Sequence, residues 1–256
     1  MEKLTKKTIK KIRELHQKKY RKIYKQFLIS GLLSVEEAIN SNYDIAEIYY
    51  TTSIVEKKNI DTIFKLAQKK NIPLYNIHHT DVKKVSTEIS PQGIIAIVNE
   101  REFTFTDLND NILILDEIKD PGNLGTIFRI ADWFGLGGLI LLDGTVDPLN
   151  PKVVQSSMGS IFHLPFVIEK SYDKIIEHCK NNSLQILISN LHSGKNLQEI
   201  NVEKKFALVI GNESRGISDI WNDYNFQNVY LKRLGKAESL NAGVATASML
   251  SVMLYK

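Results

Sequence analysis

The chain has 256 residues, of which 43% are hydrophobic and 24% are charged, enough to build two modest domains with separate cores. No apolar run reaches the roughly 18 residues that a membrane-spanning helix needs, and the Lys-rich start lacks the apolar stretch of a signal peptide. The single cysteine, Cys179, excludes an intrachain disulfide, so we expect a reducing, cytoplasmic setting. The six histidines are scattered, and the only close pair, His78 and His79, is interpreted as part of a polar loop rather than a metal site.

The formal net charge of +4 is concentrated near the N-terminus, where residues 1–25 contain eleven Lys or Arg and two acids. Apolar and aromatic residues recur there every three to four positions, which predicts an amphipathic basic helix over most of residues 5–25. Such a helix favours contact with a polyanion, here RNA. The alternatives are a solvated helix that packs one apolar side on its own domain, and a helix lying on a membrane surface.

The rest of the first half alternates between strand and helix patterns, which predicts a small layered α/β domain over residues 1–100. The expected strands are 45–50, 74–77 and 93–98, with a helix over 61–70. The polar segment 101–110 is interpreted as a linker.

The second half, residues 111–256, predicts a mostly parallel sheet covered on both faces, because short apolar strands alternate with helices. The expected strands are 112–115, 139–142, 163–168, 184–188, 206–210 and 229–231. The expected helices are 124–134, 152–158 and 239–254. In such sheets, ligands bind beyond the carboxyl ends of the strands, so the loops that follow the strands are the candidate sites.

The loop after strand 112–115 contains glycines and a proline just before a helix. This arrangement predicts free backbone amides at the helix N-terminus, which suit an anion such as phosphate. Arg129 lies about one and a half turns into the helix and could bind a phosphate through two hydrogen bonds. An ordinary strand–helix turn with a surface arginine is the alternative interpretation.

Three further loops carry candidate residues. After strand 206–210, Gly211 and Gly216 flank Glu213 and would let a ligand approach the backbone closely, although a loop with a solvated Glu is equally compatible. The segment 239–247 places small residues at a helix start, with Ser239 as the expected N-cap and Asn241 among apolar neighbours. The segment 189–194 is polar and turn-like. The Gly-x-Gly-x-x-Gly fingerprint of dinucleotide-binding proteins is absent.

Taken in order, these segments resemble the three motifs of the SpoU family of RNA 2′-O-ribose methyltransferases. The resemblance runs through nearly all of residues 111–256 and includes the stretch 147–159, while the first half is similar to the ribosomal-protein-like substrate-binding domain of many members. The chain departs from common family residues at Ser30, Gln155 and the pair Ala242-Gly243. None of these departures removes a polar residue of a motif.

The resemblance implies a knotted (trefoil) α/β methyltransferase domain, S-adenosylmethionine as cofactor, no metal, an RNA substrate with ribosomal RNA favoured over transfer RNA, and a homodimer. It assigns the methyl-transfer site to Asn123, Arg129, Glu213, Ser239 and Asn241. It assigns the cofactor pocket to Ser189, Asn190, Gly211, Leu231 and Leu240. Because an arginine is almost never neutral in a protein, we expect Arg129 to orient the ribose and phosphate rather than to remove a proton. The alternatives are an RNA- or ribosome-binding factor without turnover and a dehydrogenase or other nucleotide-fold enzyme.

Overall fold

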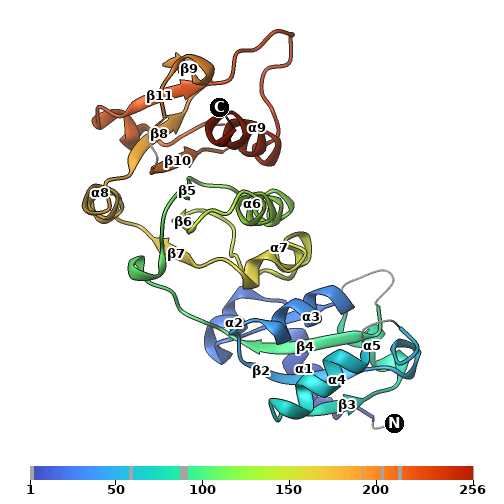
Figure 1. The fold of residues 1–256 in the computed structure, drawn as a ribbon. Coiled ribbons are helices and arrows are strands. Elements are labelled where there is room, and N and C mark those ends of the chain that lie inside the picture. The colour runs from blue at the N-terminus through green and yellow to red at the C-terminus, as the bar shows by residue number, and fades with distance from the viewer. Residues whose placement is uncertain are drawn as a thin grey trace. The chain divides into compact units, whose positions relative to one another are not determined.

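A computed structural model describes residues 3–57, 60–86, 92–191, 193–202, 205–212 and 215–255 (Figure 1). The chain forms two compact units. The first, called the N-terminal unit, contains residues 1–101 together with residues 147–163. The second, called the C-terminal unit, contains residues 102–146 and 164–256.

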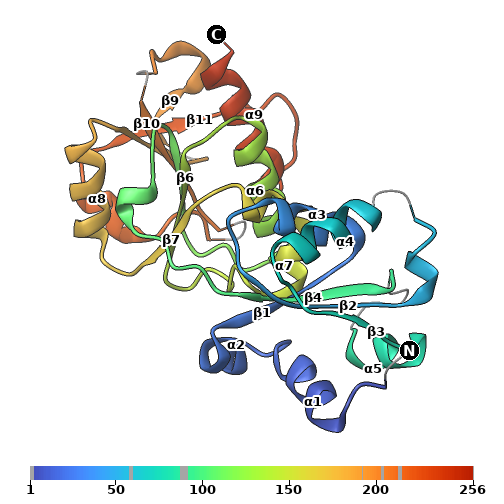
Figure 2. The same cartoon turned by 60° about the horizontal axis from the view of Figure 1, so that its bottom comes forward.

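The N-terminal unit is built on a four-stranded sheet with helices on both faces (Figure 2). The strand order is β1 (Gln26–Ser30), β4 (Ile94–Asn99), β2 (Ile45–Tyr50) and β3 (Leu74–Asn76). One face carries α1 (Lys6–Glu14) and α5 (His79–Val85), and the other carries α3 (Leu32–Asn40) and α4 (Ile60–Lys69). Successive side chains of a strand point to opposite faces, so Leu28 packs toward α1 and α5 while its neighbours do not. The predicted α/β layering of this half is therefore confirmed, although β1, α3 and α5 were not predicted.

The single basic helix predicted over residues 5–25 is wrong, because the chain turns after Leu15 and forms α1 and α2 (Lys18–Tyr24). Ile12 and Leu15 are fully buried in the core beneath the sheet, and the Nη1 of Arg21 donates to the Leu15 carbonyl at 2.9 Å. Much of the apolar side of α1 is therefore buried against its own domain. The lysines of both helices remain mostly exposed.

Residues 147–163 belong to the core of the N-terminal unit even though they interrupt the second half of the chain. They form α7 (Pro151–Ser156) and the short 3-10 helix η3 (Ser160–Phe162). The ring of Phe162 stacks on Phe27 with centroids 6.3 Å apart and meets Tyr43 edge-on at 5.2 Å. Asp147 pairs with the buried Arg21, whose Nε donates to Asp147 Oδ2 at 3.1 Å.

We expect Asp147→Ala to lower the free energy of unfolding by about 3–5 kcal/mol, because it leaves the Arg21 guanidinium buried without its carboxylate. Lys10→Ala is the matched control, because Lys10 is 77% exposed and its ion pair with Glu14 contributes less than about 1 kcal/mol. Urea unfolding of the full chain measures both. Equal, small effects of the two variants would show that the buried pair contributes little to stability.

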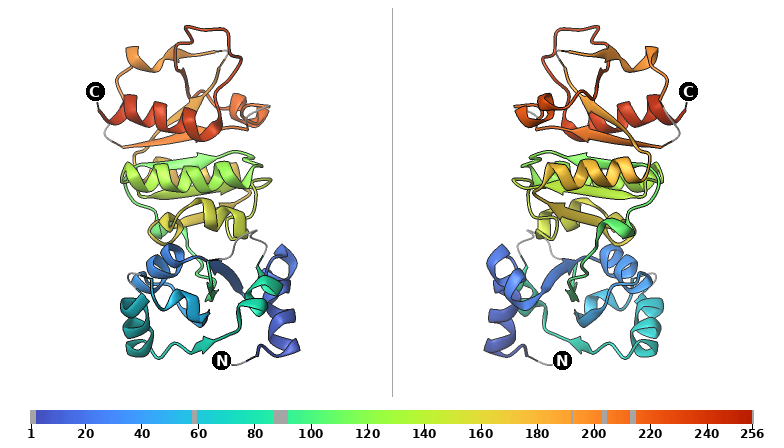
Figure 3. Two further views of the ribbon diagram at one scale, coloured as in Figure 1. Left: turned by 90° about the vertical axis from the view of Figure 1, so that its right-hand side faces the viewer. Right: turned by 90° about the vertical axis from the view of Figure 1, so that its left-hand side faces the viewer.

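The C-terminal unit is built on a seven-stranded sheet in which every pair of neighbours is parallel. The strand order is β7 (Phe166–Glu169), β6 (Gly138–Leu142), β5 (Ile112–Leu115), β10 (Phe206–Ile210), β8 (Gln185–Ser189), β11 (Gln227–Tyr230) and β9 (Lys195–Asn196). Helices α6 (Pro121–Trp133) and α9 (Ala242–Leu254) lie side by side on one face, and α8 (Tyr172–Asn181) covers the other (Figure 3). This confirms the predicted mostly parallel α/β sheet covered on both faces.

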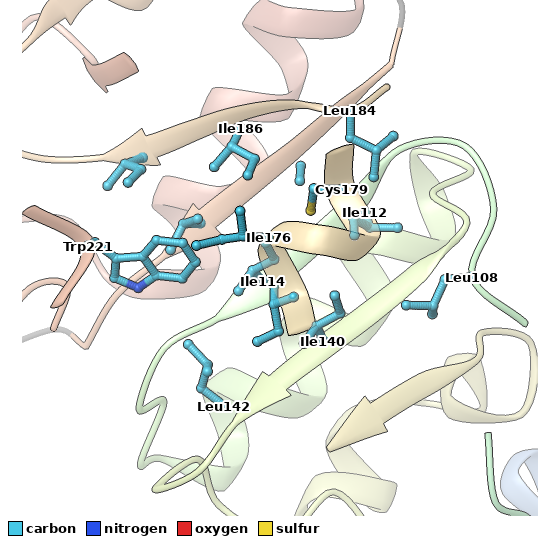
Figure 4. Close-up of a cluster of buried hydrophobic side chains, with 14 of the residues drawn as sticks. Leu108, Ile112, Ile114, Ile140, Leu142, Ile176, Cys179, Leu184, Ile186 and Trp221 are labelled. Carbon is cyan, nitrogen blue, oxygen red and sulfur yellow. The ribbon is translucent and has the colours of Figure 1, made fainter. Parts of the chain in front are cut away.

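The core beneath α8 explains why the strands of this unit read as apolar runs. Ile114 and Ile140 of neighbouring strands pack there with Ile176 and Cys179 of α8, and Trp221 lies at one edge of the cluster (Figure 4). Burial raises the pKa of the Cys179 thiol to about 12, which keeps it protonated and apolar in character. Phe103 and Phe105, in the segment interpreted as a linker, also pack against this core.

Several boundaries differ from the sequence prediction. The strand expected over 163–168 begins only at Phe166, because His163 belongs to the N-terminal unit, where its Nε2 lies 3.1 Å from Glu37 Oε2. The remaining short 3-10 helices are η1 (Thr52–Ile54), η2 (Phe105–Asp107), η4 (Leu197–Glu199) and η5 (Asp219–Asp223). Among the described residues, no helix is both long and apolar enough to cross a membrane.

Candidate active site

The carboxyl ends of four adjacent strands meet at one edge of the C-terminal sheet. Leu115 of β5 pairs with Ile210 of β10, Val209 pairs with Ile188 of β8, and Ser189 pairs with Val229 of β11. The loops that leave these strands therefore start side by side. They are four of the segments in which the sequence places candidate site residues, as the rule for open parallel sheets predicts.

The structure brings Asn123 and Asn241 together, although 118 positions separate them in the sequence. The Nδ2 of Asn241 donates to Asn123 Oδ1 at 2.8 Å. The Oδ1 of Asn241 accepts from the backbone amides of Gly243 at 3.0 Å and Val244 at 3.3 Å, so this side chain is the N-cap of α9. The Asn241 side chain thus caps α9 and also orients the side chain of Asn123.

Close packing of α6 on α9 explains the glycine that follows Asn241. A Cβ built on Gly243 would lie 3.0 Å from Thr126 Cγ2, which is tighter than ordinary van der Waals contact. Arg129 lies three residues after Thr126, one turn further along the same side of α6. The Arg129 side chain is exposed, so it is a surface residue of α6.

Two helix starts differ from the sequence prediction. Helix α6 begins at Pro121, and the Oδ1 of its N-cap Asp120 accepts from the Asn123 amide at 2.8 Å. The N-terminus expected to offer free amides to a phosphate is therefore already capped by a carboxylate. Ser239 is not the N-cap of α9 but lies exposed in the loop before it, because Asn241 takes the capping position.

The loop after β10 is folded back tightly on itself. Asn212 and Gly216 exchange backbone hydrogen bonds of 2.8 and 2.9 Å, and a Cβ on Gly211 would lie 2.4 Å from the Gly216 carbonyl. Only glycine fits at position 211, as a close approach of backbones requires. Glu213, a predicted site residue in this loop, lies outside the described residues.

The predicted cofactor residues follow the neighbouring strands. Ser189 ends β8, and the amide of Asn190 donates to the Val229 carbonyl of β11 at 2.9 Å. Leu231 directly follows β11 and is partly buried, whereas Leu240 is 48% exposed. Both residues belong to the connection between β11 and α9, which is exposed over residues 232–241.

Sequence reasoning missed a buried polar contact at the same edge. Asp116, directly after β5, is fully buried and accepts hydrogen bonds from Ser218 and Trp221. An acid that directly follows an apolar strand was a visible signal, but the sequence could not identify its partners. Among the described residues, no group of three or more His, Cys, Asp or Glu is placed to hold a metal ion.

Comparison with known proteins gives consistent matches to both halves of the chain. The profile of the SpoU rRNA Methylase family matches residues 110–251, and that of the MRM3-like substrate binding domain matches residues 6–96. The chain is 32% identical over 242 residues to the Bacillus subtilis 23S rRNA (guanosine(2553)-2′-O)-methyltransferase RlmP, covering 94% of each chain.

Solved structures match the whole fold. An AdoMet-bound rRNA methyltransferase from Sinorhizobium meliloti superposes with a TM-score of 0.87 at 26% identity, covering 99% of this chain and 96% of that one. An RNA methyltransferase of the TrmH family from Porphyromonas gingivalis, described as putative, gives 0.82 at 28% identity and covers 98% of each chain.

Proposed function

Because this chain belongs to the SpoU rRNA methylase family, we propose that it transfers a methyl group from S-adenosylmethionine to a ribose 2′-hydroxyl of an RNA. The observation that carries the proposal is the hydrogen bond between Asn123 and Asn241 beside the carboxyl ends of the parallel strands. This hydrogen bond brings together the segment after β5 and the segment 239–247, two of the three motif segments predicted from the sequence. The knot implied by the family resemblance stays a prediction.

The residues after β10, β8 and β11 fit the proposed cofactor. Backbone groups at Gly211, Ser189 and Asn190 suit the polar edges of an adenosine, and the half-exposed Leu240 suits its apolar faces. When bound, S-adenosylmethionine supplies a methyl group that its sulfonium already activates. The protein then has to place the acceptor and assist the loss of its proton.

Exposed Arg129 is proposed to orient the ribose and its adjacent phosphate through its planar guanidinium. The 2′-hydroxyl proton would pass to that phosphate or to a water as the 2′-oxygen takes the methyl group. The bond between the methyl carbon and the sulfonium sulfur would break, and its electron pair would leave with the sulfur as a neutral thioether. Asn123, fixed by Asn241, would hold the acceptor in line. Glu213 and Ser239 remain proposed members of the site on the family resemblance alone.

Two measurements test the proposal. Calorimetry should show micromolar-range binding of S-adenosylmethionine and no binding of NAD, whereas NAD binding without a response to the methyl donor would favour a dehydrogenase.

Ribose methylation should then be mapped in ribosomal and transfer RNA from a deletion strain. We propose ribosomal RNA as the substrate, on the similarity to RlmP, and transfer RNA is the second choice. Cofactor binding without any lost methylation would favour a binding factor. We propose a cytoplasmic location, where either RNA would be available.

The exposed lysines of α2 are proposed to contact RNA phosphates. Replacing Lys18 and Lys22 with Gln should weaken RNA binding and reduce the slope of log K against log salt by about 0.7 to 0.9 for each lost phosphate contact. Substitution is the appropriate test, because deleting residues 1–25 would remove the buried Ile12 and Leu15. The matched control is Lys65→Gln with Lys69→Gln on α4, which has the same spacing. If both double variants weakened RNA binding equally, the α2 lysines would contribute only to the overall positive charge and would not make specific phosphate contacts.

A homodimer is proposed from the family resemblance, supported by exposed apolar side chains on α6 and at α9. Trp133 is 81% exposed, Val244 52% and Tyr255, the C-cap of α9, 73%. We expect Trp133→Ser to weaken self-association at least about tenfold, because buried aromatic residues dominate interfaces. Light scattering across a dilution series measures the self-association. The control is Ile168→Ser, because Ile168 is also exposed but lies on β7. The mass of one 29.1 kDa chain for the wild type at micromolar concentration would contradict the dimer.

A further inference from the structure

Asp116 is a buried carboxylate whose hydrogen bonds all lead to one segment of the chain. It is 0% exposed. Its Oδ2 accepts from the Ser218 amide at 2.7 Å and from Trp221 Nε1 at 3.1 Å, and its Oδ1 accepts from Ser218 Oγ at 2.8 Å. Among the described residues, no Lys or Arg forms an ion pair with it. The burial of its charge is therefore offset by three donors that come from residues 218–221.

These bonds join the loops that leave two neighbouring strands. The backbone amide of Asp116 donates to the Ile210 carbonyl at 2.9 Å, which extends the pairing of β5 and β10 to their ends. One residue later, the Glu117 carbonyl accepts from Asn212 Nδ2 at 3.0 Å. Glu117 has a φ of 58°, a left-handed conformation that costs energy for a residue with a side chain. The surrounding contacts hold this strained turn against the β10 loop.

We infer that Asp116 is a positioning residue that holds Gly211 and Gly216, the two glycines that follow β10, in the conformation that binds the cofactor. The inference rests on the proposed function. Trp221, the third partner, is itself anchored in the core, where its ring meets Tyr172 at 5.2 Å and Phe226 at 6.3 Å. The carboxylate therefore links the turn after β5 to Ser218 and Trp221, which follow the loop after β10 in the chain. Figure 4 shows the Trp221 ring at one edge of the buried cluster.

Asp116→Asn is the informative variant because it changes the charge and almost nothing of the shape. The amide oxygen can accept from the Ser218 amide and from Trp221. The new NH₂ group meets Ser218 Oγ, which can turn and accept. We expect S-adenosylmethionine binding to weaken about tenfold or more, because hydrogen bonds to a charged acceptor are roughly twice as strong as neutral ones.

Asn111→Ala is the matched control, because Asn111 ties together the opposite ends of the same two strands. Its Oδ1 accepts from the Phe206 amide at 2.8 Å. This variant should lower the melting temperature and leave S-adenosylmethionine affinity within about twofold of wild type, because the lost bond is far along the strands from the carboxyl edge. Calorimetry well below the melting temperature of each variant separates loss of affinity from loss of stability.

Cofactor affinity that is unchanged in Asp116→Asn, or lowered equally in Asn111→Ala, would overturn the inference and leave Asp116 a purely structural residue. If Asp116→Asn does not fold, Ser218→Ala replaces it, because it removes the donor to Oδ1 and keeps both donors to Oδ2. Weaker binding by Ser218→Ala supports the inference and unchanged binding overturns it. A wild-type protein that does not bind S-adenosylmethionine would instead contradict the proposed function.

Discussion

Arg129→Ala is expected to reduce methyl transfer at least about 100-fold, because a nucleophile misplaced by about 1 Å loses that much rate. The fold should survive, since the side chain is exposed and lies in the middle of α6 rather than in the core. Affinity for S-adenosylmethionine should also be unchanged, because the proposed pocket is formed by the loops after β10, β8 and β11. Turnover, cofactor affinity and melting temperature must be measured on the same preparation.

Arg129→Lys should restore little activity, because lysine keeps the positive charge but loses the planar pair of donors. Lys180→Ala, which removes an exposed cation from α8 on the other face of the sheet, is the control and should leave turnover unchanged.

A structural role for Arg129 would require a partner within the protein. Asp116 and Glu117, the two acids that follow β5, have other partners, since Asp116 accepts from Ser218 and Trp221 and Glu117 pairs with Lys119 at 3.2 Å. Near-normal turnover of Arg129→Ala, or a loss of turnover that matches a collapse in melting temperature, would remove Arg129 from the proposed site.

Continuous apolar runs were the most informative signal for the fold. The strands 45–50, 112–115 and 206–210 have the predicted bounds, because each is an apolar-rich run that ends at polar residues or glycine. The segment 26–40 was missed because Phe27, Leu28 and Ile29 form only a short run directly after a basic stretch. Residues 147–163 could not be placed, since the Arg21–Asp147 pair joins positions 126 apart and nothing local predicts it.

The candidate site was predictable to the extent that it depends on topology. Parallel strands carry their loops to one edge, so the motif segments could be expected to meet there. Local chemistry was less predictable. The sequence did not show that Asp120 would accept from the backbone amide of Asn123, or that Asn241 rather than Ser239 would cap α9. Both depend on where a helix begins, which is the least reliable part of a pattern-based prediction.

Asn241→Asp is expected to reduce turnover at least about tenfold without lowering stability, which separates the two roles of this side chain. Aspartate is as good an N-cap as asparagine, and its charge suits the positive end of the α9 dipole, so the cap of Gly243 and Val244 is kept. Aspartate cannot donate to Asn123 Oδ1. Asn123 can regain a hydrogen bond only by turning its amide so that Nδ2 donates to position 241. Its Oδ1 would then take the place of Nδ2, so Asn123 would present an acceptor to the substrate where it had presented a donor.

Asn241→Ala completes the comparison, because it removes the cap as well as the donor. It should lower the free energy of unfolding by about 1 kcal/mol, the usual cost of losing an N-cap, and should lose turnover at least as severely as Asn241→Asp. Asn150→Ala is the matched control, since Asn150 caps α7 through its bond to the Lys152 amide at 2.9 Å and is not a predicted site residue. It should cost similar stability with normal turnover. If Asn241→Asp turns over like the wild type while Asn241→Ala loses activity only in proportion to its stability, then Asn241 acts only as a helix cap. The orientation of Asn123 would then not limit the reaction.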